Sequence, residues 1–174
     1  NKGLEVIEAH FLFDTSYDNI EVVVHPQSII HSMVEYKDAS VIAQLGSPDM
    51  RLPIQYALNY PERKGMIAQP INFYEISQLT FEKPDMDTFK CLKLAYKAGK
   101  IGGLAPTVLN GANEEAVALL LEEKIKFLQI AEIIEECMKV FEKQYSNELT
   151  LENIINLDKS VREYIRKWEL GVNN

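Results

Sequence analysis

The spacing of hydrophobic positions changes along this chain, from mixed patterns in the first third to helical patterns in the second half. Apolar side chains recur at helical spacing over residues 1–13 and predict an amphipathic helix. A Val-rich run then predicts a strand at 20–25, and alternation predicts an antiparallel hairpin formed by 29–36 and 40–45. Pro53 fits the first turn of a further helix.

The pattern weakens between Tyr60 and Pro84, where prolines and a glycine interrupt it. We expect a linker there, with one strand at 78–81. After Asp85 the apolar period is helical and predicts a series of helices, near residues 89–99, 107–124, 127–141, 150–155 and 158–168. Each of these helices has one apolar face, so they are expected to pack as a small bundle.

These patterns predict an α+β fold: an antiparallel sheet piece with flanking helices, followed by a separate small C-terminal helical bundle. We expect residues 1–60 to be the end of an α+β domain, 61–85 an extended linker and 86–174 the helical bundle domain. The chain begins at Asn1 without an initiator Met, and we expect it to be a piece of a longer protein.

The composition of the chain argues against three classes of protein: nucleic-acid-binding, membrane-spanning and disulfide-rich proteins. The 174 residues carry a formal net charge of −8, which argues against broad nucleic-acid binding because a polyanion needs a basic face. No apolar run approaches the roughly 18 residues that span a membrane, and no signal-peptide pattern is present. Two cysteines are too few for a disulfide scaffold, which favours a reducing compartment.

The first candidate chemistry lies at the start of the chain. Asn1, Lys2 and Glu5 fall within one sector of the first predicted helix, at its N-terminal end. Free N–H groups and the helix dipole at that end suit a phosphate, and the Glu5 carboxylate suits a hard divalent cation. Spacing alone, however, favours a surface ion pair between Lys2 and Glu5, which are three residues apart.

Other notable residues have structural interpretations. His25 precedes Pro26 at a strand end, where an imidazole is usually stacked or hydrogen-bonded, and His31 on a strand face fits a satisfied core imidazole. Cys137 falls within an apolar helical stripe and is expected to be buried and inert. Lysines recur on one face of the helix predicted near residues 89–99, which predicts a solvated face.

Four blocks of sequence resemble the 1-deoxy-D-xylulose 5-phosphate reductoisomerase family. They are NKGLE at 1–5, HPQSIIHSMV at 25–34, QLGSPDMR at 44–51 and LNGANE at 109–114. The resemblance runs along the whole chain but covers only the back part of that enzyme, without its Rossmann domain. Ala39 departs from the family, which often has Gly in the hairpin turn.

The resemblance implies NADPH-dependent conversion of 1-deoxy-D-xylulose 5-phosphate to 2-C-methyl-D-erythritol 4-phosphate, in non-mevalonate isoprenoid synthesis, with Mg²⁺ or Mn²⁺. It implies that Glu5 is a metal ligand that also touches substrate, and that Asn1 and Lys2 bind substrate. His31 and Met50 match positions near the nicotinamide, which makes Met50 a candidate cofactor contact.

On the same basis, residues 1–60 would end the catalytic or connective domain, and the protein would be a bacterial cytoplasmic homodimer with no nucleic-acid or membrane partner. The chain alone would lack the cofactor domain and be inactive. A stand-alone binding or assembly module without catalysis is the alternative.

Overall fold

A computed structural model describes residues 1–169, in which the chain forms two units that we treat separately. The helical unit consists of Asn1–Val22 and the chain from Asp85 onward, and the hairpin unit is Val23–Pro84. None of the helices in the described part of the chain is long and apolar enough to cross a membrane.

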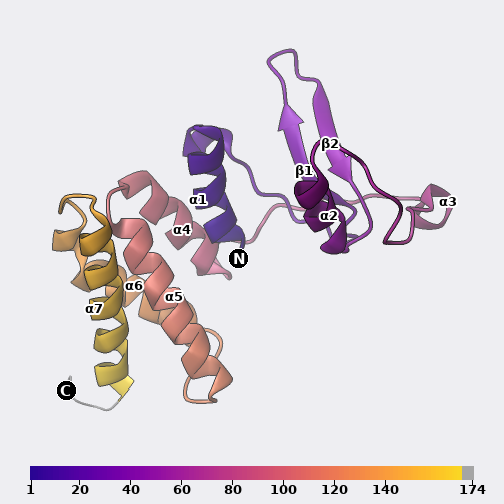
Figure 1. Ribbon diagram of the computed structural model, residues 1–174. Coiled ribbons are helices and arrows are strands. Elements are labelled where there is room, and N and C mark those ends of the chain that lie inside the picture. The colour runs from indigo at the N-terminus through magenta and orange to yellow at the C-terminus, as the bar shows by residue number, and fades with distance from the viewer. Residues whose placement is uncertain (170–174) are drawn as a thin grey trace. The chain divides into compact units, whose positions relative to one another are not determined.

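The helical unit is built around one central helix (Figure 1). Its elements are α1 (Lys2–Phe13), the 3₁₀ turn η1 (Tyr17–Asn19), α4 (Lys90–Ile101), α5 (Ala105–Leu121), α6 (Gln129–Val140), η2 (Glu142–Gln144) and α7 (Leu151–Glu169). Helix α5 contacts α4, α6 and α7, and α1 packs on α4. The helices predicted near residues 89–99, 107–124 and 127–141 are therefore confirmed, as α4, α5 and α6.

Small and branched side chains explain why α5 is central. Ala105, Val108, Ala112 and Ala116 are fully buried, so neighbouring helices approach α5 closely on more than one side. Gly111 faces α7 closely, because a Cβ atom there would lie 2.8 Å from Asp158 Oδ1.

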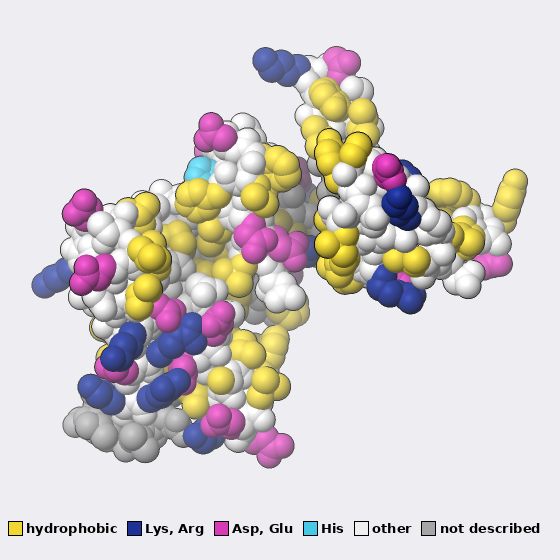
Figure 2. Space-filling view, in the orientation of Figure 1, with side chains coloured by type: hydrophobic (Ala, Val, Ile, Leu, Met, Phe, Trp, Pro, Cys, Tyr) yellow, Lys and Arg dark blue, Asp and Glu magenta, His cyan; other side chains and the backbone are white. Residues whose placement is uncertain are grey.

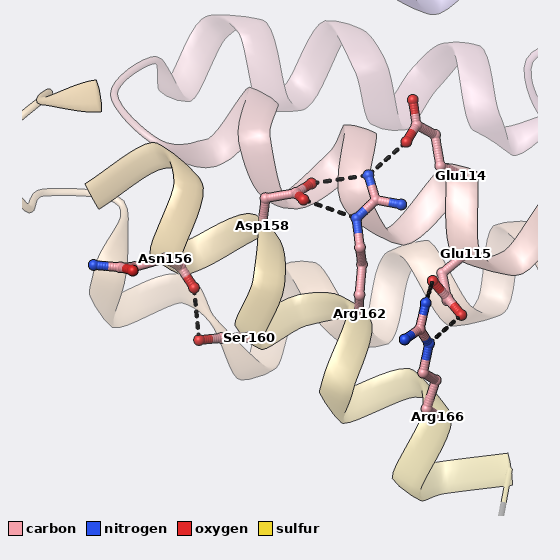
Figure 3. Close-up of polar contacts among 7 residues, drawn as sticks. All are labelled: Glu114, Glu115, Asn156, Asp158, Ser160, Arg162 and Arg166. Atoms are coloured by element: carbon pink, nitrogen blue, oxygen red, sulfur yellow. Dashed lines mark hydrogen bonds and ion pairs between the residues drawn. The ribbon is translucent and has the colours of Figure 1, made fainter. Parts of the chain in front are cut away.

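Two arginines of α7 tie that helix to α5 through carboxylates (Figure 3). Arg162 donates to Asp158 Oδ2 at 2.8 Å and to Glu114 Oε2 at 2.5 Å. Arg166 binds the buried Glu115 carboxylate with both Nε and Nη2, at 2.8 and 3.1 Å. Such paired geometry suits the planar guanidinium group.

The hairpin unit contains the two strands of the sheet. Strands β1 (Ile30–Glu35) and β2 (Val41–Leu45) pair antiparallel, with Met33 opposite Ala43 and an irregularity between Ile30 and Ser32. Helices α2 (Arg51–Asn59) and the short α3 (Phe73–Ile76) follow. The predicted α+β class, the hairpin and the helix beginning near Pro53 are confirmed.

The strands predicted at 20–25 and 78–81 are wrong, because only one residue pair, Val24 with Glu82, forms a bridge there. Ile20 and Val22 instead pack against the core of the helical unit, and the Ile20 carbonyl accepts a hydrogen bond from Tyr96 Oη at 2.8 Å. The helix α3 was not predicted.

The two helices predicted at 150–155 and 158–168 are one helix, α7. Thr150 does cap it, since its hydroxyl accepts from the Asn153 amide at 3.2 Å. Asp158 does not begin a new helix, because it lies within α7, where its carboxylate accepts hydrogen bonds from Arg162 one turn further on.

The domain division into 1–60, 61–85 and 86–174 stays a prediction. Within this chain, α1 groups with the later helices rather than with the hairpin, which no local pattern predicted. Residues 170–174 of the predicted bundle domain lie outside the described residues.

Candidate functional site

The N-terminal turn of α1 presents the three residues that the sequence singled out. Asn1 is the N-cap, and its carbonyl accepts the first helical hydrogen bond, from the Glu5 amide at 3.0 Å. Val6 and Ile7, next along the same helix, are buried in the core of the helical unit. This burial turns Asn1, Lys2 and Glu5 toward solvent.

Lys2 and Glu5 form an ion pair across the first turn, between Lys2 Nζ and Glu5 Oε2. Their side chains remain 63% and 50% exposed, so both groups are open to exchange this partner for a ligand. Free backbone N–H groups at this end of α1 add positive potential beside the ammonium group. The surface ion pair and the ligand-binding interpretation are thus compatible.

The site supplies one carboxylate for a cation. Among the described residues, no group of three or more His, Cys, Asp or Glu side chains is arranged to hold a metal ion. Mg²⁺ or Mn²⁺ usually needs more than one protein oxygen, so Glu5 fits as a single ligand and not as a complete site.

His31 and Met50 lie in the hairpin unit. The His31 ring is exposed, and an acceptor oxygen lies near each of its nitrogens: Gln44 Oε1 is 3.1 Å from Nδ1 and the Ser28 carbonyl oxygen is 3.1 Å from Nε2. A neutral ring donates to one of these two oxygens. His31 is therefore hydrogen-bonded, as predicted for a structural imidazole, but it is not a core residue. Met50 precedes α2 and is 72% exposed, without a contact that gives it a role.

One polar pair near Met50 was missed in the sequence. Arg51 binds the Asp49 carboxylate with Nε at 3.0 Å and Nη2 at 2.6 Å. This hydrogen bonding lowers the pKa of the Asp49 carboxyl to about 2. The available signal was the Asp-x-Arg spacing, which allows a carboxylate just before a helix to reach an arginine in the first turn of that helix.

The structural interpretations of the other residues are confirmed. His25 stacks on Phe81 with ring centroids 4.9 Å apart, and its Nδ1 is 2.8 Å from the Thr80 carbonyl. Cys137 is 1% exposed, and burial raises the pKa of its thiol to about 12, which leaves it inert.

The lysine face of α4 is solvated, as predicted. Lys90, Lys93, Lys97 and Lys100 are all exposed. Lys100 pairs with Asp18 at 2.5 Å and Lys93 with Asp87 at 3.3 Å. These pairs satisfy two of the ammonium groups locally.

Comparison with known proteins extends these observations. A family model described as "DXP reductoisomerase C-terminal domain" matches residues 45–164. The 1-deoxy-D-xylulose 5-phosphate reductoisomerase of Clostridium beijerinckii is 72% identical over 167 residues, which are 96% of this chain and 43% of that protein. That of Clostridium perfringens strain 13 is 69% identical over 165 residues, 95% of this chain and 42% of that protein.

Two solved structures are also similar. A DOX-P reductoisomerase in complex with NADPH, fosmidomycin and magnesium aligns with a TM-score of 0.93 and 46% identity, covering 99% of this chain and 44% of that one. The enzyme from Zymomonas mobilis, in complex with NADPH, aligns with a TM-score of 0.87 and 44% identity. The alignment covers 97% of this chain and 44% of that one. This chain thus spans less than half the length of the relatives that it matches. Since the family model covers most of it, the chain belongs to the DXP reductoisomerase family and carries that family's C-terminal domain.

Proposed function

We propose that this chain acts as part of an NADPH-dependent reductoisomerase that converts 1-deoxy-D-xylulose 5-phosphate to 2-C-methyl-D-erythritol 4-phosphate. The observation that carries the proposal is the joint exposure of Asn1, Lys2 and Glu5 on the first turn of α1. Membership of the family supports the reaction, and the relatives' complexes with NADPH and magnesium support the cofactors.

Each of the three residues has a role that its chemistry suits. The Glu5 carboxylate is one ligand of Mg²⁺ or Mn²⁺ and contacts a substrate oxygen. The Lys2 ammonium and the Asn1 amide hold substrate hydroxyl or phosphate oxygens at the positive end of α1. Lys2 leaves its pair with Glu5 when an anionic ligand takes that place.

The remaining parts of the site lie outside this chain. When bound, the divalent cation polarises substrate oxygens and NADPH supplies a hydride. His31 and Met50 are proposed to line the site on the nicotinamide side, with Met50 offering its exposed thioether chain as an apolar contact. The enzyme is proposed to be a homodimer of the cytoplasm, and the Clostridium relatives support a bacterial source.

Replacing Glu5 by Gln in the full-length enzyme tests the proposal. Gln keeps the size and one acceptor oxygen of Glu but loses the charge that a hard cation prefers. Turnover at fixed Mg²⁺ is expected to fall roughly a hundredfold, equivalent to about 2.7 kcal/mol in the activation barrier. Thermal unfolding should hardly change, because Glu5 is exposed and makes few core contacts.

Glu8→Gln is the matched control, because Glu8 is exposed about one turn along α1 and outside the NKGLE block. It should keep near-normal turnover and the wild-type Mg²⁺ dependence. Normal turnover in both variants would contradict the assignment of Glu5 as a metal ligand. Loss of activity with loss of folding in both would make the first turn of α1 structural only.

A further inference from the structure

Gly3, between Lys2 and Glu5, has no space for a side chain. A Cβ atom at Gly3 would lie 2.5 Å from the Ala95 Cβ and 3.6 Å from the Cys91 carbonyl oxygen. Carbon atoms in contact are normally about 3.5–4.0 Å apart. Ala95 lies on α4 and is 1% exposed, so it has little room to move away. The α1 and α4 backbones therefore approach each other at Gly3 more closely than a larger residue permits.

The direction of this contact separates it from direct ligand binding. The missing Cβ would point into α4, whereas the Lys2 and Glu5 side chains are exposed to solvent. Val6 and Ile7, in the same helix, are buried and hold its rotation about its own axis. Gly3 then determines how deeply the first turn of α1 sits on α4.

We propose that the Gly3–Ala95 contact is a positioning contact, through which α4 sets the place of the Lys2 ammonium and the Glu5 carboxylate for substrate and metal. The ligand roles of those two groups rest on the proposed function above. Gly3 and Ala95 themselves touch no ligand, and they act only by fixing the backbone that carries Lys2 and Glu5. A misplacement of about 1 Å in such a site can lower the rate roughly a hundredfold.

The test compares Gly3→Ala with the double variant Gly3→Ala/Ala95→Gly in the full-length enzyme. The double variant moves one methyl group from α4 to α1, so the helices can approach as in the wild type. Mn²⁺ binding, followed by the electron paramagnetic resonance signal of free Mn²⁺, is the readout independent of turnover. We expect Gly3→Ala to weaken Mn²⁺ binding roughly tenfold or more and to raise the KM for substrate, and the double variant to restore both.

Gly99→Ala and Gly65→Ala are the controls. Gly99 lies on α4 like Ala95, and a Cβ there would overlap the ring of Tyr17 from η1. Gly99→Ala should therefore lower the unfolding temperature without changing the Mn²⁺ affinity. A Cβ at Gly65 would have no atom within 4 Å, so Gly65→Ala should change neither the unfolding temperature nor the Mn²⁺ affinity. If Gly3→Ala fails to fold, Ala95→Ser is used as the test variant in its place. It adds one atom to the α4 side of the same contact, and the same loss of Mn²⁺ affinity is expected.

The outcomes separate this inference from the proposed function. A wild-type enzyme without Mn²⁺ binding or turnover would contradict the proposed function itself. An active wild type with unchanged Mn²⁺ affinity in Gly3→Ala, or in Ala95→Ser where that variant replaces it, would overturn the positioning role alone. The role would also be overturned if the double variant folded but did not recover, or if Gly99→Ala weakened Mn²⁺ binding equally.

Discussion

Among single residues, Asp49 is a carboxyl group whose pKa the structure lowers to about 2, through hydrogen bonds from Arg51. An unpaired Asp has a pKa of about 3.9. Because the folded pKa is the lower of the two, the pair stabilises the fold above about pH 4 and loses this effect as the pH falls toward about 2.

Replacing Arg51 by Gln should therefore raise the pKa of Asp49 toward its ordinary value. A carbon-detected NMR titration of the side-chain carboxyl measures this directly. Asp38 is the internal control, since the hydrogen bonds that lower its pKa come from Ser40 and should persist. An Asp49 pKa that stays near 2 in Arg51→Gln would show that Arg51 is not the cause.

The guanidinium of Arg162 is the polar link that joins Asp158 to Glu114. Arg162→Met should lower the free energy of unfolding by roughly 1–2 kcal/mol, because it leaves two partly covered carboxylates close together without their cation. Urea denaturation measures the change. Lys139→Met breaks a more exposed pair with Glu135 and should cost about 0.5 kcal/mol or less. Equal losses in the two variants would contradict the role of Arg162.

Among the elements, the β1–β2 hairpin contains a strained turn. Ala39 has a φ of 64°, in the left-handed region that disfavours a residue with a Cβ atom. The turn is nevertheless closed, because the Tyr36 amide donates to the Ser40 carbonyl at 2.8 Å and Asp38 accepts from the Ser40 amide. The left-handed conformation of Ala39 is thus accommodated locally and does not break the hairpin.

Ala39→Gly should relieve this strain and stabilise the hairpin by about 0.5–1 kcal/mol, after the greater flexibility of Gly in the unfolded chain is subtracted. Hydrogen exchange of the β1 and β2 amides measures it, because the hairpin can open locally. Ala43→Gly in the extended part of β2 is the control and should destabilise by a similar amount. Faster exchange in Ala39→Gly would contradict the strain argument.

At the scale of the whole molecule, the chain alone is expected not to turn over substrate. On the proposed function, Glu5 is the single metal carboxylate that this chain supplies, and the chain covers 43% of its Clostridium beijerinckii relative. We therefore expect the chain alone not to position a hydride donor against a substrate. NADPH oxidation by the purified chain, with substrate and Mg²⁺, is the assay. Measurable turnover would contradict the proposed division of the site and favour a self-sufficient module.

The hairpin unit also exposes much apolar surface. Hydrophobic side chains gather over the hairpin (Figure 2), and Val34, Val41 and Ile42 are each more than half exposed. Exposed apolar strands tend to associate, so the purified chain should self-associate at micromolar concentrations. Sedimentation velocity measures this, and a monomer at every concentration would count against association through this surface.

The sequence by itself determined the features that depend on nearby residues. The helices with one apolar face and the alternating hairpin follow from side-chain periodicity. The candidate site was also predictable, because Asn1, Lys2 and Glu5 lie within five residues on one helix and need no distant partner to come together.

The tertiary structure decided where distant segments meet. Ile20 and Val22 have a strand-like pattern, but the core of the helical unit buries them, so the predicted strand does not form. The packing of α1 on α4 and the contact between Gly3 and Ala95 depend on surfaces far apart in the chain. The periodicity of the sequence indicates which face of a helix or strand is apolar. It does not indicate which other element packs on that face, because close packing requires two surfaces that match in shape.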